Sequence, residues 1–376
     1  MEENFYLDKL LKLKSNFSVK IISGVRGVGK TTLLKNFANN LKSAGVTEEE
    51  IIFIDCAEND RLKNFQAFYE FVEARTSALE KFFLLADDFD RVVEGEKAIN
   101  ALFVGLPAEI YVTVSNETFA EKICDLLHDN CDVLKIYPLS FAEYSKIFQS
   151  EDALQNYLHF GGLHEVIGAD KKFLPNLLRG LAYEMMFEIV EKNSLRNAEL
   201  FRRMLQTFAQ NVGKPFGLSN VLKTLDIVKR SKSVEKYFDL CTILFKKIPR
   251  YDIKAGKTLS GSERFYCVDN GILCALASKI DETALMENAV CIELLRRGYS
   301  LSSGKVGSMD VNFVAERDAK KIFIQVLPTS GISVRKATRP LRSLSVDASK
   351  FLITFKREKN FGDVPSITLH DFLSNV

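Results

Sequence analysis

The chain has 376 residues, 47% of them hydrophobic, which is enough for two or three domains that each bury a core. No apolar run reaches the roughly 18 residues that a membrane span needs, and the first residues lack the apolar segment of a signal peptide. These features predict a soluble cytoplasmic protein with no membrane partner. The seven cysteines are scattered and none forms a C-x-x-C pair, which predicts reduced, mostly buried thiols and no zinc site.

The net charge of +2 hides an uneven distribution of charge along the chain. Residues 1–194 carry 21 Lys and Arg against 31 Asp and Glu. Residues 195–260 carry 14 against 5, and residues 301–376 carry 12 against 7. A basic segment next to an acidic one indicates either contact with nucleic acid or docking of the basic segment on the acidic part.

The first 140 residues alternate between strand and helix patterns. Apolar runs typical of buried parallel strands lie at 19–22, 51–54, 82–85, 110–114 and 133–136. The amphipathic stretches between them lie at 31–41, 64–79, 94–103 and 118–127. This alternation predicts an α/β domain with a doubly wound parallel sheet, which binds its ligand at the carboxyl ends of the strands.

The first of these strands leads into a G-x-x-x-x-G-K-[ST] sequence that is followed by a helix, the context of a phosphate-binding loop. Glycines let successive backbone N–H groups face an anion, and the helix adds the positive end of its dipole. We predict that ATP binds here, with Lys30 on the β- and γ-phosphates and the Thr31 hydroxyl on Mg²⁺. The predicted cofactor-binding residues are Gly24, Val25, Arg26, Gly27, Val28, Gly29, Lys30, Thr31, Thr32 and Ser115.

Two acids follow the strand at 82–85. Asp87 is predicted to hold Mg²⁺ together with Thr31, and Asp88 stands where a water-activating acid is expected. The predicted catalytic set is therefore Lys30, Asp87 and Asp88. An acidic loop without a catalytic role is the alternative, but the order of loop, strand and acids favours the catalytic interpretation. Ser115 ends the next strand and is predicted to sense the γ-phosphate, although a polar strand end without that role fits its residue type equally well.

The chain after Pro138 divides into three predicted segments. Ser140 and Glu143 form a capping box that opens a helical lid or linker over 141–194. Residues 195–275 show three helices followed by a hairpin, the outline of a winged helix-turn-helix. In this segment the predicted helices are 199–209, 220–225 (capped by Ser219) and 234–245, and the predicted strands are 248–253 and 264–268. The last segment, 276–376, is predicted to be a small α/β domain with a helix at 287–297 and strands at 311–315, 322–326, 351–354 and 366–369.

Residues 220–257 carry most of the basic charge of the predicted winged helix. Its basic side chains are Lys223, Lys229, Arg230, Lys232, Lys236, Lys246, Lys247, Arg250, Lys254 and Lys257. These positions fall on the turn, third helix and wing, which contact phosphates in winged-helix proteins. Double-stranded DNA is slightly favoured as the partner over docking on the acidic domain. Glu235 and Asp239 on the third helix indicate weak reading of bases.

These motifs together resemble a family of bacterial and archaeal ATPases that have an AAA-type P-loop domain followed by a C-terminal domain of unknown function. The resemblance covers nearly the whole chain and is carried by residues 24–31, 82–88, 113–116, 137–141, 161–163, 250–252, 265–271, 287–288 and 309–313. It implies ATP binding, ATP hydrolysis and a winged-helix module.

The sequence departs from the family pattern at several positions. Asp88 replaces a Glu, Val114 a Gly and His164 a Pro, and Asp129-Asn130 replaces a Gly-Arg whose arginine could serve the phosphates. ATP binding is therefore better supported than fast hydrolysis.

The last segment resembles a restriction-nuclease-like core. Glu287 and Asp310 match the acids of such a core, but Gln325 and Leu327 stand in place of its second acid and its lysine. Because an amide is a poor Mg²⁺ ligand and leucine cannot stabilise an oxyanion, we predict no cleavage activity.

The sequence thus predicts four parts: a P-loop domain (1–140), a helical lid (141–194), a winged helix-turn-helix (195–275) and a degenerate nuclease-like domain (276–376). The predicted function is an AAA-type, Mg²⁺-dependent, slow ATPase whose nucleotide state controls a module that acts on DNA or on a protein partner. The alternative is an ATP-gated binding switch with little or no hydrolysis.

Overall fold

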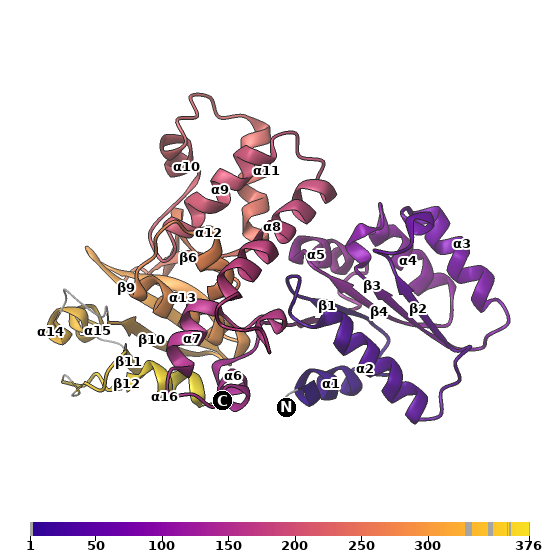
Figure 1. The fold of residues 1–376 in the computed structure, drawn as a ribbon, viewed down its shortest axis with the longest axis horizontal. Coiled ribbons are helices and arrows are strands. Elements are labelled where there is room, and N and C mark those ends of the chain that lie inside the picture. The colour runs from indigo at the N-terminus through magenta and orange to yellow at the C-terminus, as the bar shows by residue number, and fades with distance from the viewer. Residues whose placement is uncertain (1–2, 328–332, 345–348, 359, 361, 376) are drawn as a thin grey trace. The chain divides into compact units, whose positions relative to one another are not determined.

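The computed structural model describes residues 3–327, 333–344, 349–358, 360 and 362–375. The chain forms two compact units, Met1–Tyr137 and Pro138–Val376 (Figure 1). The predicted boundaries at 194–195 and 275–276 both fall inside the second unit. No helix in the described ranges combines the length and apolar character needed to cross a bilayer.

The first unit is built on a five-stranded sheet in the order β2-β3-β4-β1-β5. All neighbouring strands are parallel, as expected for a doubly wound sheet. The strands are β1 (Val19–Ser23), β2 (Ile51–Asp55), β3 (Phe82–Asp87), β4 (Ala108–Val114) and β5 (Cys131–Lys135). All five strands predicted from apolar runs are confirmed.

Helices cover both faces of this sheet. They are α1 (Glu3–Lys12), α2 (Lys30–Ser43), α3 (Phe65–Thr76), α4 (Gly95–Gly105) and α5 (Glu117–Leu126). Side chains of α3, α4 and α5 join the strands in one core around Phe68 and Phe89, whose rings meet edge to face at 5.1 Å. On the other face Phe37 of α2 packs against Tyr111 of β4, with ring centroids 4.5 Å apart. The connection from β1 to α2 lies at the carboxyl edge of the sheet, where the phosphate-binding loop was predicted.

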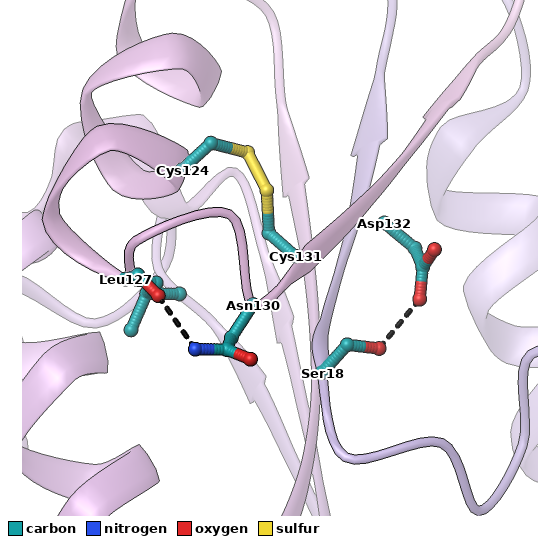
Figure 2. Close-up of a disulfide and its surroundings, with 6 residues drawn as sticks. All are labelled: Ser18, Cys124, Leu127, Asn130, Cys131 and Asp132. Atoms are coloured by element: carbon teal, nitrogen blue, oxygen red, sulfur yellow. Dashed lines mark hydrogen bonds between the residues drawn. A yellow bond between two sulfur atoms is a disulfide. The ribbon is translucent and has the colours of Figure 1, made fainter.

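A disulfide joins Cys124 near the end of α5 to Cys131 at the start of β5, seven positions later (Figure 2). The prediction that all cysteines are reduced is therefore wrong for this pair. Within the turn between the two cysteines, Asn130 donates a side-chain N–H to the Leu127 carbonyl at 2.9 Å. The Cα atoms of Cys124 and Cys131 lie 5.5 Å apart. The other five cysteines are free, and four of them are buried.

We expect reduction of this disulfide to lower the free energy of unfolding of the first unit by about 2 kcal/mol, because a short closed loop constrains the unfolded chain. Denaturant titration with and without dithiothreitol measures the difference. The variant Cys124→Ala/Cys131→Ala is the control and should not respond to reductant. An equal response of wild type and double variant would assign the effect to another cause.

The second unit combines helices with a seven-stranded mixed sheet in the order β12-β11-β10-β9-β8-β6-β7. The strands are β6 (Phe245–Asp252), β7 (Lys257–Cys267), β8 (Ser300–Val306), β9 (Met309–Arg317), β10 (Lys320–Val326), β11 (Ser349–Thr354) and β12 (Ser366–Thr368). The helices are α6 (Phe141–Ile147), α7 (Ala153–Phe160), α8 (Leu174–Lys192), α9 (Ala198–Gln210), α10 (Leu218–Thr224), α11 (Lys232–Leu240), α12 (Asn270–Leu276), α13 (Glu282–Arg296), α14 (Val334–Ala337), α15 (Arg339–Arg342) and α16 (Leu369–Ser374).

The hairpin that was predicted as a wing is part of this larger sheet. β6 pairs antiparallel with β7 on one side and parallel with β8 on the other, with Arg250 opposite Ser303. The predicted third helix ends earlier than expected, at Leu240, and the chain enters β6 at Phe245. Gly217, not Ser219, caps α10. The capping box of Ser140 and Glu143 is confirmed.

A buried polar network holds α7, β7, α12 and α13 together. Asp269 caps α12 by accepting from the N–H of Ile272 at 3.0 Å, and it also accepts from the N–H of Gly162 at 2.8 Å. Asn288 of α13 bridges the backbone of Cys267 and the side chain of Asn270. Burial raises the pKa of Asp269 to about 6 despite these hydrogen bonds. The motif at 265–271 and the Gly161-Gly162 turn therefore belong to the same buried hydrogen-bond network.

Candidate nucleotide-binding site

The loop between β1 and α2 has the backbone that a phosphate cradle needs. Gly27 and Gly29 adopt left-handed conformations with φ of 82° and 90°, which side-chain-bearing residues rarely adopt. Gly29 is the N-cap of α2 and has no side chain to occupy the free N–H groups of the first helical turn. At Gly24 a Cβ would lie 2.6 Å from the Ile136 carbonyl oxygen, so only glycine fits there.

The side chains of this loop separate into buried and exposed groups. Val25 and Val28 are buried and anchor the loop in the domain, whereas Arg26 is exposed. In the first turn of α2, Thr31 is half-buried and Thr32 is exposed. The loop is therefore fixed from beneath, while its outer face is open to a ligand.

Lys30 lies across the loop. It is only 6% exposed, and its Nζ donates to the Val25 carbonyl at 3.1 Å and to Ser115 Oγ at 3.3 Å. Ser115 follows the end of β4, the strand next to β1, so the fold brings together two predicted site residues that are 85 positions apart. A lysine ammonium group held across such a loop offers a positive charge of the kind that binds phosphate.

Asp87 ends β3 and is buried, with 3% of its surface exposed. Its Oδ1 accepts from the Thr113 hydroxyl at 2.5 Å, and the same hydroxyl oxygen accepts from the Asp88 N–H at 2.9 Å. Thr113 thus fixes the carboxylate and the following peptide with one side chain. The sequence pattern placed Thr113 in the polar run 113–116 at the end of this strand, but it did not predict that Thr113 contacts Asp87.

Asp88 has a left-handed backbone, with φ 49° and ψ 41°. One of its carboxylate oxygens lies 4.0 Å from Arg91 Nε. Asp90, which the sequence analysis did not select, accepts from the Ser115 N–H at 3.2 Å. The end of β3 is therefore tied to Ser115 by Asp90 and to β4 by Thr113. This constrained turn sets the direction of the Asp88 side chain.

The residues present fit ATP and Mg²⁺. The loop offers a helix N-terminus that no side chain of its N-cap Gly29 covers, a buried lysine and, one residue later, a hydroxyl. Asp87 supplies a carboxylate with one oxygen held by Thr113, and oxygen donors of this kind suit Mg²⁺.

The nuclease-like positions of the second unit are arranged differently. Asp310 on β9 receives two guanidinium groups, from Arg250 Nη2 at 3.2 Å and from Arg264 Nη2 at 3.1 Å. Gln325 on β10 accepts from the backbone N–H of Asn312 at 3.3 Å. Since two arginines already neutralise Asp310, this cluster does not offer a metal site.

Glu287 on α13 lies near this cluster. It accepts from the Tyr266 hydroxyl at 3.3 Å. Burial raises its pKa to about 7, against the opposing effect of Arg264. This carboxyl is therefore largely neutral below that pH and is a weak ligand for a cation.

The basic residues of 220–257 fall into two groups. Five of them make contacts within the second unit: Arg230 with Glu235, Lys236 with the Asn193 carbonyl, Lys247 with Glu263, Arg250 with Asp310, and Lys246. The other five are exposed: Lys223, Lys229, Lys232, Lys254 and Lys257. The exposed group lies on α10, on the turn to α11, at the start of α11 and at the tip of the β6–β7 hairpin.

Comparison with known proteins bears on both units. A family described as an AAA domain matches residues 16–145, and a domain of unknown function (DUF8612) matches residues 151–283. A curated protein of Haemophilus influenzae strain Rd, named as an uncharacterized protein, is 30% identical in an alignment of 340 residues. The alignment covers 85% of this chain and 85% of that protein.

The comparison with solved structures gives matches of low sequence identity and low TM-score. The Aeropyrum pernix Orc1 protein in complex with DNA is 13% identical, with a TM-score of 0.33, over 78% of this chain and 94% of that one. The Thermotoga maritima RuvB Holliday junction branch migration motor is 13% identical, also with a TM-score of 0.33, over 66% and 88%. The family match coincides with the parallel sheet and the phosphate-binding loop, so residues 16–145 form an AAA-type P-loop domain, and the whole chain belongs to the same family as the Haemophilus influenzae protein.

Proposed function

We propose that this protein binds ATP with Mg²⁺ at the loop between β1 and α2 and hydrolyses it slowly. The observation that carries this proposal is the position of Lys30, buried across a glycine loop and hydrogen-bonded to Ser115. In the proposed complex Lys30 contacts the β- and γ-phosphates, and the Thr31 hydroxyl and Asp87 hold the magnesium ion. Mg²⁺ supplies charge neutralisation for the phosphate oxygens.

Slow hydrolysis follows from two local features. Asp88 is one methylene shorter than glutamate, and its carboxylate lies toward Arg91. At the turn before β5, where an arginine would add positive charge, Asn130 uses its side chain to hold the Leu127 carbonyl (Figure 2). The site therefore lacks both a well-placed acid to orient water and a cation from this turn, and each such group contributes strongly to phosphoryl transfer.

We expect Asp88→Glu to raise kcat for ATP hydrolysis about tenfold or more, because the longer side chain reaches further toward the attacking water. The rate of phosphate release at saturating ATP measures this, with Asp90→Glu as the control that leaves the rate unchanged or lower. If Asp88→Glu lowered the rate, Asp88 would not be the acid that orients water.

An ATP-gated switch without turnover is the second form of this function. It is favoured by the same short acid and by the missing arginine. Tight ATP binding with no phosphate release, with or without duplex DNA, would identify the switch. Steady release that depends on Mg²⁺ would identify the slow ATPase.

We further propose that the nucleotide state controls a DNA-binding surface on the second unit. The five exposed lysines around α10, α11 and the hairpin tip support this, because exposed lysines can neutralise phosphates. A protein partner for the same basic surface is the alternative.

The DNA surface can be tested with Lys229→Glu/Lys232→Glu. We expect weaker duplex binding at every DNA sequence, and a plot of log affinity against log salt whose slope is smaller by about 2. Fluorescence anisotropy across a salt series measures both. Lys122→Glu, an exposed substitution on α5, reverses one charge away from this surface and should leave binding intact. An unchanged salt slope in the double variant would exclude this surface.

A further inference from the structure

The second unit contains a cavity of about 490 Å³ that none of the proposed activities uses. It opens between helices α7, α8 and α9 on one side and α12 with the residues after it on the other. All of these helices belong to the same unit, and α12 packs on the other three (Figure 1). The size falls in the range of small-molecule sites, which is roughly 300–1,000 Å³.

The floor of this cavity is apolar. It is formed by Leu178, Ala182 and Met186 of α8 and by Leu276 at the end of α12, all of which are buried. At roughly 30 Å³ for each water-sized group, the volume holds about 16 non-hydrogen groups. A chain of about ten carbons with a small polar head fits this space.

The ionisable side chains at the cavity with a nitrogen base are one histidine and two arginines. His159, Arg179 and Arg202 line it, and no aspartate or glutamate is among its lining residues in the described part of the chain. The guanidinium of Arg202 is already neutralised by Glu199, through contacts of 2.7 and 2.6 Å.

Arg179 is different because its hydrogen-bond acceptors are neutral. It donates to the Pro175 carbonyl at 3.3 Å and to the Asn176 side chain. The first turn of α8, which carries Pro175, contains no acidic residue. The rim near Arg179 therefore has a positive charge that is not balanced by a carboxylate of the described residues.

We propose that this cavity binds a small amphipathic monoanion, an apolar chain that ends in one carboxylate. The chain lies on the floor formed by α8 and α12, and the carboxylate pairs with the Arg179 guanidinium. A guanidinium can hold a carboxylate through two parallel hydrogen bonds, and burial of the chain on Leu178, Met186 and Leu276 supplies the apolar contribution.

The reactivity of the Cys274 thiol can show whether a ligand occupies the cavity. It lines the cavity and is the only free cysteine that is not fully buried. Burial raises the pKa of its thiol to about 12, so labelling by iodoacetamide is slow and is best followed at mildly alkaline pH. A ligand on the cavity floor should block this reaction, and Cys274→Ser gives the background from the other thiols.

The test uses the full chain and three probes with the same ten-carbon chain: decanoate and decyltrimethylammonium below their micellar concentrations, and decanol below its solubility limit. We expect decanoate to slow the labelling of Cys274, decanol to do so more weakly, and the cation to have no effect. Titration calorimetry of the unlabelled protein gives the affinities. Equal protection by all three probes, or none by decanoate, would overturn the assignment.

Three variants locate the site. Arg179→Ala should weaken decanoate binding about tenfold and leave decanol unchanged, as loss of one charge-assisted contact predicts. Ala275→Phe, which fills the cavity from α12, should abolish both. Arg203→Ala, an exposed arginine on α9 outside the lining, is the matched control and should bind like wild type. If Ala275→Phe fails to fold, Arg179→Ala decides, because its side chain is exposed. Unchanged decanoate affinity in Arg179→Ala would reject the site.

Discussion

Replacement of Lys30 by alanine is expected to abolish measurable binding of ATP with Mg²⁺. The ammonium group is buried across the loop, where it donates to the Val25 carbonyl at 3.1 Å and to Ser115 Oγ at 3.3 Å. Loss of a charge-assisted contact to two phosphates should weaken binding by about a hundredfold or more. Calorimetric titration of ATP into wild type and variant, at equal Mg²⁺, measures this difference.

Lys35→Ala is the matched control for this experiment. Lys35 lies on the same helix, α2, but is exposed on its outer side, so its loss should leave ATP affinity within about twofold. Circular dichroism of both variants establishes that α2 is intact. Equal ATP affinity in wild type and Lys30→Ala would remove the nucleotide site from this loop.

Replacement of Glu287 by glutamine is expected to stabilise the second unit at neutral and alkaline pH. Burial raises the pKa of Glu287 from 4.5 to about 7 in the folded protein, so the folded state binds this proton more tightly than the unfolded chain does. The stability that comes from the neutral carboxyl is fully present below pH 4.5 and is lost as the pH rises through 7. Glutamine keeps the neutral shape and cannot ionise.

The difference in unfolding free energy between Glu287→Gln and wild type should therefore grow with pH. It should be near zero at acid pH and reach up to about 3 kcal/mol in favour of the variant above pH 7. Urea titrations across the pH range measure it, and Glu316→Gln, an exposed substitution on β9, should give a flat difference. A variant that is less stable at alkaline pH would mean that Glu287 is ionised and paired in the folded state.

The first unit was largely predictable from sequence because its signals are local. Each buried parallel strand is a short apolar run, and the phosphate-binding loop joins one of them to a helix with fixed glycine positions. The neighbourhood of Lys30 and Ser115 follows from strand order. The hydrogen bond from Thr113 to Asp87 could not be predicted from sequence, because it depends on the rotamer that Thr113 of β4 adopts toward the neighbouring strand β3.

The second unit was less predictable because its sheet joins distant segments. β8 was not expected, since Ser300–Val306 is mostly polar and small and shows no apolar run. Without β8, nothing in the sequence connects the hairpin to the strands after 309. The disulfide was likewise missed, because two cysteines seven positions apart give no signal until the turn between α5 and β5 is known.

The pairing of β6 with β8 limits how residues 195–275 can be separated from the rest of the chain. A gene fusion or deletion with its junction near residue 275 would cut the sheet in two and leave unpaired backbone N–H and C=O groups along Arg250–Asp252 on one piece and Ser303–Lys305 on the other. Exposed edge strands with unpaired backbone groups tend to pair with other chains and aggregate. Arg250 and Arg264 would also lose their shared carboxylate, Asp310. A fusion that moves residues 195–275 to another protein would therefore need to include β8 and the strands after it.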